Sequence, residues 1–264
     1  MRHSFIIIFL CLSCQNGTAP VNKSLLSKDS SVAAGSAIDT IHPLTSDSGK
    51  IIEVGYLDNF EKTPQITIES ASEKEFLILK PNVYLKQTKI EKNSKEFYLQ
   101  TIKKKHSFRI YKDYGGEKSW SGYNYNGYYP ELQLYAITEI TTSENLGFAQ
   151  LSLLDSLTDN YYNLISFGDG SVELPIPSLD KQYMVYYYNA AYENKNCDIG
   201  ILKISDRKQA NNYLREHAFY HSDEFAIEQI KWKTNHCFYI KGYEEVYIND
   251  QWEKKFSYYK ATFK

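Results

Sequence analysis

Short runs in which apolar and polar residues alternate fill much of the chain from Ile51 onward. In the run Gln65–Glu69, for example, isoleucines alternate with threonine and glutamate. Alternation with a period of two is typical of a half-buried β-strand. Similar runs, separated by Pro, Gly, Asn and Ser, are Phe76–Leu79, Val83–Lys86, Phe97–Ile102 and Ser107–Tyr111. The pattern predicts an all-β body over residues 51–264, made of short antiparallel strands.

A different kind of strand is predicted after the prolines Pro175 and Pro177. Residues Tyr183–Tyr188 are apolar or aromatic at successive positions, which suits a strand covered on both faces. The prolines cannot donate hydrogen bonds to a sheet, so they belong to the approach to this strand. The polar turn Ser178–Gln182 then leads directly into the strand.

Other elements are predicted from turns and from helical spacing. The runs Phe148–Leu154 and Tyr161–Phe167 flank the polar turn Thr158-Asp159-Asn160 and predict a hairpin. Ile199–Ile204 predicts a later single strand. The one helix predicted in the body is Asp206–His217, because some of its apolar residues fall on one face.

The turn and strand at Pro175–Tyr186 recur in weaker form. The segments Pro130–Ile137, Trp232–Ile240 and Asn93–Leu99 place Glu131, Asn235 and Asn93 where the first unit has Asp180. The unit resembles the blade signature of TolB-type β-propellers at Pro175, Ser178, Asp180 and the strand Met184-Val185-Tyr186, but lacks its aromatic, second proline and glycine. The resemblance implies a propeller-like array of blades, with a β-sandwich or an incomplete propeller as the alternatives.

The composition supports a folded β domain and narrows the partners. The chain has 264 residues, a net charge of −2, 24 Tyr and 13 Phe. Aromatic rings favour strands and cover wide sheet faces. A net charge near zero provides no electrostatic reason to expect nucleic acid, so we expect no nucleic-acid partner.

The first residues read as an export signal. Arg2 and His3 precede the apolar stretch Phe5–Leu12, which is too short for a membrane helix and suits a secretory signal. Ser13-Cys14 follows and resembles the lipobox of bacterial lipoproteins, although Cys11 stands where leucine is usual. The resemblance implies that residues 1–13 are removed and that Cys14 carries the lipid. A plain signal peptide with an incidental cysteine is the alternative.

Residues 14–50 are rich in Ser, Thr, Ala, Asn and Gly, which predicts a flexible linker between the lipidated Cys14 and the domain. A short helix at Val32–Ile38 is the alternative. Gln15 follows the cysteine where aspartate would, by family analogy, favour the inner membrane. We therefore predict a cell-envelope protein held at the outer membrane, with the membrane as a partner through the lipid.

The densest aromatic stretch is a candidate ligand surface. Rigid rings interleaved with Gly, Asn and Ser suit recognition of a sugar or a protein. The alternative is an ordinary strand whose rings pack on the core. The candidate residues are Trp120, Tyr123, Tyr125, Tyr128 and Tyr129.

Three other groups of residues are weaker candidates for a functional or structural site. His217 and His221 would share a face of a helix, as in zinc sites, but a polar surface loop is the default and no metal or cofactor is expected. An oxidising envelope would permit a disulfide between Cys197 and Cys237. The basic run Lys103–His106 is interpreted as a solvated strand end.

The carboxylates Asp155, Asp159, Asp169, Glu173 and Asp180 fall in turns. Hydrogen bonding to nearby backbone explains acidic residues there without catalysis, and wet turn tips would keep them ionised. Our main hypothesis is a non-catalytic, lipid-anchored protein that binds a macromolecule or glycan. The alternatives are an envelope glycoside hydrolase and a lipid-tethered protein that sequesters a toxin.

Overall fold

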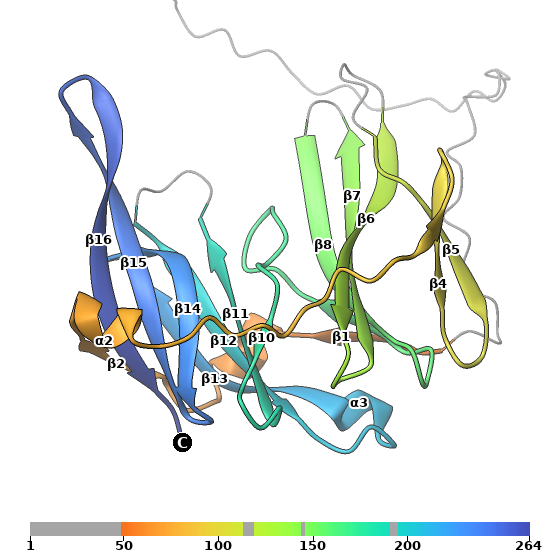
Figure 1. The fold of residues 1–264 in the computed structure, drawn as a ribbon, viewed down its shortest axis with the longest axis horizontal. Helices are drawn as coiled ribbons and strands as arrows, with labels where there is room; N and C mark the ends of the chain where they lie inside the picture. Colours follow the sequence, from red (N-terminus) through yellow and green to blue (C-terminus); the bar gives the residue numbers. More distant parts are fainter. Residues whose placement is uncertain (1–48, 113–118, 144–145, 191–194) are drawn as a thin grey trace, which may run out of the picture. The chain divides into compact units, whose positions relative to one another are not determined.

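The computed structural model describes residues 49–112, 119–143, 146–190 and 195–264. These residues are mostly β-strands in several antiparallel sheets, so the predicted all-β class is confirmed. Four sheets, here named A to D, are present in the described part of the chain (Figure 1).

Sheet A has five strands in the order β1-β9-β8-β7-β6. All neighbours are antiparallel except β1 and β9, which run parallel. Its strands are β1 (Ile51–Val54), β6 (Trp120–Tyr129), β7 (Leu134–Ser143), β8 (Leu146–Asp155) and β9 (Tyr161–Leu164). The predicted hairpin around Asp159 is therefore confirmed as β8 and β9.

Sheets B and C have four strands each, in the orders β10-β11-β12-β13 and β14-β15-β16-β2. Sheet B contains β10 (Ile176–Pro177), β11 (Tyr183–Asn189), β12 (Cys197–Ile204) and β13 (Leu214–Ser222). Sheet C contains β14 (Ala226–Thr234), β15 (Cys237–Ile248), β16 (Gln251–Thr262) and β2 (Thr67–Ser70). The edge strand β2 comes from far earlier in the chain and pairs antiparallel with the last strand, β16.

Sheet D is the smallest, with three strands in the order β3-β4-β5. These are β3 (Glu91–Lys92), β4 (Glu96–Gln100) and β5 (Lys105–Arg109). The helices in the described residues are short: α1 (Leu57–Phe60), α2 (Glu73–Leu77) and α3 (Ala210–Tyr213). Within that part of the chain, no helix is long and apolar enough to cross a membrane.

The apolar cores link the sheets in the order D, A, B, C. One cluster joins residues of sheets A and B, and includes Leu153 and Tyr186. A second joins sheets B and C, and a third, smaller cluster joins sheets A and D. On the other face of sheet C, Phe76 of α2 packs against Cys237 and Tyr239. Sheets A and B are therefore each covered on both faces.

Strand β11 has the predicted environment. Met184 and Tyr186 pack into the cluster shared with sheet A, while Tyr183 and Val185 pack into the cluster shared with sheet C. All four side chains are buried. The expectation of a strand covered on both faces is confirmed, and β10 with its proline lies at the sheet edge, where a missing donor is tolerated.

The four repeated segments each supply one strand to one sheet. The strands that follow Asn93, Glu131, Asp180 and Asn235 are β4, β7, β11 and β15. Each sheet contains a run of strands that are consecutive along the chain, and each of these four strands is the second of its run. The turns before three of these strands are also bonded to one another. Lys181 Nζ lies 2.8 Å from Glu131 Oε2, and the Asp180 backbone N–H donates to Asn235 Oδ1 at 3.1 Å.

Three predicted elements are wrong. The run Phe76–Leu79 lies at the end of helix α2 and just beyond it, because Ser72 and Glu75 form a capping box that starts the helix. Val83–Lys86 is no strand and makes only a single bridge, at Lys86. Only Ala210–Tyr213 of the predicted helix Asp206–His217 is helical, and β13 begins at Leu214.

Candidate ligand-binding site

The segment of residues 87–92 crosses the junction of sheets A and D and positions the candidate site. Just before it, Lys86 and Tyr128 exchange backbone hydrogen bonds of 2.8 and 2.9 Å. The two segments approach closely because β6 bulges at Gly127, whose φ is +141°. A Cβ at Gly127 would lie 2.8 Å from Leu85 Cγ, so only glycine fits there without a shift.

Two open depressions lie beside this segment. The first, the Tyr98 depression, has a volume of about 400 Å³. It is lined by tyrosines and by charged and polar groups: Thr88, Lys89, Ile90, Glu91, Tyr98, Leu99, Gln100, Lys105, Tyr128 and Tyr135. Lys105 Nζ lies 4.4 Å from the centre of the Tyr98 ring and 2.7 Å from Glu91 Oε2. A cation, a carboxylate and aromatic rings therefore share one small surface.

The second, the Tyr123 depression, has a volume of about 440 Å³ and shares Thr88, Lys89 and Ile90 with the first. Its other lining residues are Gln87, Lys92, Phe97, Ile110, Tyr123, Asn124 and Tyr125. Burial raises the pKa of Tyr123 to about 12, and the nearby Glu139 carboxylate adds to the shift. The phenol is therefore neutral at physiological pH and can donate a hydrogen bond.

The tyrosine rings are held in place by their own hydroxyls. Tyr128 donates to Gln133 Oε1 at 2.8 Å, and Tyr135 donates to the Gln100 carbonyl at 2.9 Å. The hydroxyls of Tyr125 and Thr88 lie 2.6 Å apart. The rings of Tyr128 and Tyr135 also contact each other, with centroids 4.6 Å apart. The aromatic surfaces are thus ordered without a ligand, which lowers the entropy cost of binding one.

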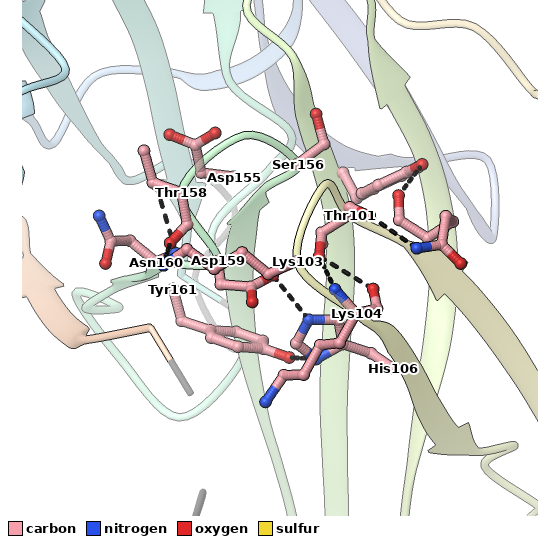
Figure 2. A network of polar contacts seen from close by, with 12 residues as sticks. Thr101, Lys103, Lys104, His106, Asp155, Ser156, Thr158, Asp159, Asn160 and Tyr161 are labelled. Atoms are coloured by element: carbon pink, nitrogen blue, oxygen red, sulfur yellow. Dashed lines mark hydrogen bonds and ion pairs between the residues drawn. The ribbon is translucent and has the colours of Figure 1, made fainter. Parts of the chain in front are cut away.

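A buried polar network ties sheet D to sheet A behind this surface (Figure 2). His106 on β5 lies between Asp159 of the β8–β9 turn and Tyr161, the first residue of β9. Its Nε2 is 2.9 Å from Asp159 Oδ1, and its Nδ1 is 2.9 Å from the Tyr161 hydroxyl. The facing turns are joined as well, because the Ile102 backbone N–H donates to Ser156 O at 2.8 Å and Lys103 Nζ donates to Thr158 O at 3.0 Å.

The protonation of the network follows from its environment. Burial acts to raise the pKa of Asp159, but hydrogen bonds with Thr101 and His106 outweigh it and hold the pKa below the usual value. Burial raises the pKa of Tyr161 far above the usual phenol value. With its proton on Nε2, the His106 ring donates to Asp159 Oδ1 and accepts at Nδ1 from the Tyr161 hydroxyl. Both ring nitrogens of His106 have a partner, whereas Asp159 Oδ2 is buried with no hydrogen-bond partner among the described residues.

This network does not form an open catalytic site. Asp159 has no exposed surface, and the side chain of His106 is 5% exposed. The position of Asp159 contradicts the expectation that the turn carboxylates are wet, since its φ of +65° turns the side chain into the sheet junction. Lys103 and Lys105 are exposed at the start of β5, as the interpretation of Lys103–His106 as a solvated strand end expects, and only the buried His106 contradicts it.

The other predicted carboxylates do not gather into one site. Asp155 is also fully buried, and its Oδ2 lies 3.2 Å from Arg207 Nε. Asp169, Glu173 and Asp180 are exposed. Asp180 caps its own turn as expected, because it accepts from Ser178 Oγ at 2.7 Å and from the Gln182 backbone N–H at 3.0 Å.

The predicted aromatic residues are divided between ligand surface and core. All five lie in strand β6, as the alternative of an ordinary strand predicts. Tyr123, Tyr125 and Tyr128 line the two depressions. Trp120 is half-buried at the start of the strand. Tyr129 belongs to the core and donates its hydroxyl to the Pro175 carbonyl at 2.8 Å.

The predicted pairs of histidines and cysteines are separated. His217 Nε2 contacts the Lys264 carbonyl at 2.7 Å, whereas His221 Nδ1 lies 2.7 Å from Asp198 Oδ1. In the described residues, no group of three or more His, Cys, Asp and Glu is placed to hold a metal ion. Cys197 and Cys237 are both free thiols and belong to different apolar clusters, so the predicted disulfide is absent.

Several lining residues were missed from the sequence. Tyr98 and Tyr135 lie in segments that the sequence predicted as strands, but nothing in the pattern marked their side chains as part of a ligand site. Thr88 and Gln100 belong to no recognisable sequence motif. Their site depends on contacts between distant segments, which no local pattern reports. His106 had a local signal, because the alternation in Lys105–Arg109 places it on the same face as the buried Phe108.

Comparison with known proteins adds no relative. No family model matches the chain, and neither a curated protein nor a solved structure matches it.

Proposed function

We propose that this chain is a non-catalytic, lipid-anchored protein of the cell envelope that binds a glycan in the two depressions beside residues 87–92. The observation that carries the proposal is the set of ordered tyrosines at this place. Four of them, on β4, β6 and β7, converge on one surface with lysines, a carboxylate and side-chain amides. They are Tyr98, Tyr125, Tyr128 and Tyr135.

The chemistry of the surface suits a sugar better than an apolar ligand. A sugar ring presents C–H groups on its faces and hydroxyls at its edge, and aromatic rings beside polar donors and acceptors match both. Lys89 is common to both depressions, so one oligosaccharide could contact it from either side. Volumes of about 400 and 440 Å³ lie within the usual range for small-molecule sites.

The propeller-like arrangement belongs to the same proposal. Each repeated segment gives one strand to a different sheet, and the bonds of Glu131 with Lys181 and of Asp180 with Asn235 link successive sheets at their turns. A chain of sheets joined face to face in this way is what successive propeller blades require. The ligand site would then lie between the first two blades.

The absence of catalysis is proposed from the state of the acidic groups. A general acid needs a raised pKa and access to the substrate. The pKa of Asp159 is lowered and its carboxylate is closed to solvent. Asp155 is buried beside Arg207. These features support a binding protein over the hydrolase alternative.

The anchor is proposed from Ser13-Cys14 after the apolar stretch Phe5–Leu12. Cells fed a fatty-acid analogue should label the wild-type chain, and Cys14→Ala should abolish the label. The labelled protein should also fractionate with the outer membrane. Equal labelling of the two chains would contradict the lipid anchor and leave the ligand site unaffected.

The ligand site is tested with a panel of oligosaccharides and peptidoglycan fragments, measured by titration calorimetry. An aromatic contact contributes about 0.5–1.5 kcal/mol in addition to the apolar area that it buries, so Tyr128→Ala and Tyr125→Ala should weaken binding by about 10-fold or more. Tyr125→Phe keeps the ring and loses only the contact with Thr88, so it should bind within about 3-fold of wild type. Tyr56→Ala, an exposed tyrosine outside the depressions, is the matched control.

Two results would overturn the proposed site. One is that no glycan in the panel binds with a Kd below about 1 mM. The other is that both alanine variants fold and bind as the wild type does. Release of free sugar by the wild-type chain would replace the binding protein with the hydrolase.

A further inference from the structure

The hairpin formed by β15 and β16 extends beyond the rest of sheet C (Figure 1). Strand β14 pairs with β15 only as far as Tyr243, and β2 pairs with β16 only over Tyr259–Thr262. Residues 244–255 therefore have strand partners only within the hairpin. A two-stranded ribbon of this kind is marginally stable alone and offers its side chains to a partner.

The end of the hairpin carries large apolar side chains. Tyr247 and Trp252 are directly opposite in the register, and their ring centroids lie 5.3 Å apart. They are 59% and 60% exposed, and Ile248 beside them is 45% exposed. The turn that joins the strands is Asn249-Asp250, both with positive φ, as tight hairpins prefer. We call Tyr247, Ile248 and Trp252 the aromatic tip.

Charged pairs form a belt behind the tip. Lys255 Nζ lies 2.9 Å from Glu244 Oε1, and Lys254 Nζ lies 2.7 Å from Glu228 Oε2. Glu245 is directly opposite Lys254 in the register. At about 3.4 Å per residue, the belt begins about 7–10 Å from the tip. Apart from the exposed carboxylates of Asp250 and Glu253 beside the tip, the charged belt begins at about the depth to which interfacial elements enter a bilayer, about 5–10 Å.

We propose that the aromatic tip inserts into the headgroup region of a lipid bilayer and orients the domain on the membrane. Trp and Tyr are the residues that favour this region, because an apolar ring and a polar edge suit its two sides. Both lysines of the belt are already paired, and Asp250 and Glu253 lie at the tip. The surface is therefore suited to zwitterionic lipids rather than to anionic ones.

The inference rests on the proposed lipid anchor for its setting, because the acyl chains of Cys14 would keep a bilayer within reach of the domain. The predicted linker would tether the domain to the bilayer and so raise the effective concentration of lipid at the tip. Even weak insertion of the tip would then be populated. The tip itself is independent of the anchor and can be tested without it.

The test uses the full chain carrying Cys14→Ala and vesicles of phosphatidylcholine, with and without lipids brominated in their acyl chains. The chain has three tryptophans, of which Trp232 is buried and Trp252 is the tip residue. Tryptophan emission should shift to the blue with vesicles and should be quenched by the brominated lipid. Trp252→Phe should remove both effects, because the signal sequence contains no tryptophan.

A second variant measures affinity. Tyr247→Ser with Trp252→Ser should weaken vesicle binding by about 10-fold or more in the Cys14→Ala chain. Both side chains are exposed, so the melting temperature should stay unchanged, and Tyr56→Ser should bind like the parent. Replacing a third of the lipid by phosphatidylglycerol should change affinity by less than about 3-fold.

Three outcomes would overturn the inference. One is an emission spectrum of Trp252 that does not respond to vesicles, which would favour a protein partner for the tip. The second is vesicle binding that persists in the double variant. The third is binding that requires the anionic lipid. Each leaves fatty-acid labelling of Cys14 unaffected, so failure of the tip and failure of the anchor are distinguishable.

Discussion

The junction of sheets A and B and the junction of sheets A and D are built in different ways. Between A and B the packing is apolar and large, with Phe60, Phe167 and Tyr186 in contact through their rings. Between A and D the apolar cluster is smaller and is combined with the polar network of His106, Asp159 and Tyr161.

The difference suggests that the A–B junction mainly stabilises the fold, whereas the A–D junction mainly determines how its two sheets are arranged. Apolar packing stabilises in proportion to the area buried and tolerates small shifts. Hydrogen bonds are directional, so the contacts of His106 with Asp159 and Tyr161 favour one arrangement of the two sheets. The depressions lie at the second junction, where a ligand benefits from side chains held in one geometry.

The largest effect is expected for Tyr186→Ala at the A–B junction. Tyr186 is fully buried and its ring stacks on Phe167 at a centroid distance of 5.7 Å. Truncation of a large core aromatic costs about 3–5 kcal/mol of unfolding free energy. Urea denaturation measures it, and a loss below about 1 kcal/mol would mean that this junction does not hold the fold.

Asp159→Asn is expected to cost about 1–3 kcal/mol at pH 7, because it removes the charge but keeps the shape at the A–D junction. Asparagine also tolerates the positive φ found at this position. Since folding lowers the pKa of Asp159, the stabilisation is present above the unfolded pKa of about 3.9 and is lost as the pH falls through the folded value.

The difference in unfolding free energy between wild type and Asp159→Asn should therefore be large at pH 7 and should shrink below about pH 4. Asp169→Asn, in an exposed turn, is the matched control and should change stability by less than about 0.5 kcal/mol. A difference that does not vary with pH would show that the charge of Asp159 contributes nothing.

Removal of one tyrosine hydroxyl should lower the free energy of unfolding at the A–D junction but not at the A–B junction. Tyr161→Phe loses the bond to His106 Nδ1 and should destabilise by about 0.5–1.5 kcal/mol. The buried hydroxyl of Tyr186 has no hydrogen-bond partner within the described residues, so Tyr186→Phe should be neutral or stabilising. Thermal unfolding of both variants checks this, and destabilisation by Tyr186→Phe would reveal a partner for that hydroxyl.

The smallest effect is expected for the exposed ion pair at the rim of the Tyr98 depression. Glu91→Gln breaks the 2.7 Å contact with Lys105, and the side chains of both residues are exposed. Such pairs contribute about 0–1 kcal/mol and are screened by salt. The melting temperature should barely change at 0.15 M salt, and a large fall would mean that surface charge holds sheet D.

Local patterns in the sequence predicted the parts of the fold that depend on local residues. The apolar run Tyr183–Tyr188 predicted β11, and the turn at Asp159 predicted the β8–β9 hairpin. Helix α2 was misassigned because Phe76–Leu79 looks like a strand, although Ser72 and Glu75 gave a capping signal three residues apart.

The site was only partly predictable for the same reason. Tyr123, Tyr125 and Tyr128 were found because aromatic residues concentrate in β6. The segment of residues 87–92 that faces them has no sequence signal, and its place follows from the Lys86 pairing with Tyr128 and the bulge at Gly127. The position of such a segment depends on contacts with residues far away in the sequence. A short stretch of sequence therefore does not predict it.

The pairing of β2 with β16 has a consequence for how the chain folds. Thr67 is opposite Thr262, so β2 must wait for a strand that is made much later. Contacts between such distant residues are slow to form, because a long loop must close before they contribute free energy.

Until then, the edge of β16 that β2 later covers has unpaired backbone groups. Exposed strand edges of this kind promote aggregation in folding intermediates. Completion of sheet C is therefore expected to be a late step of folding, and a chain delivered amino terminus first would depend on protection of β2 until β16 arrives.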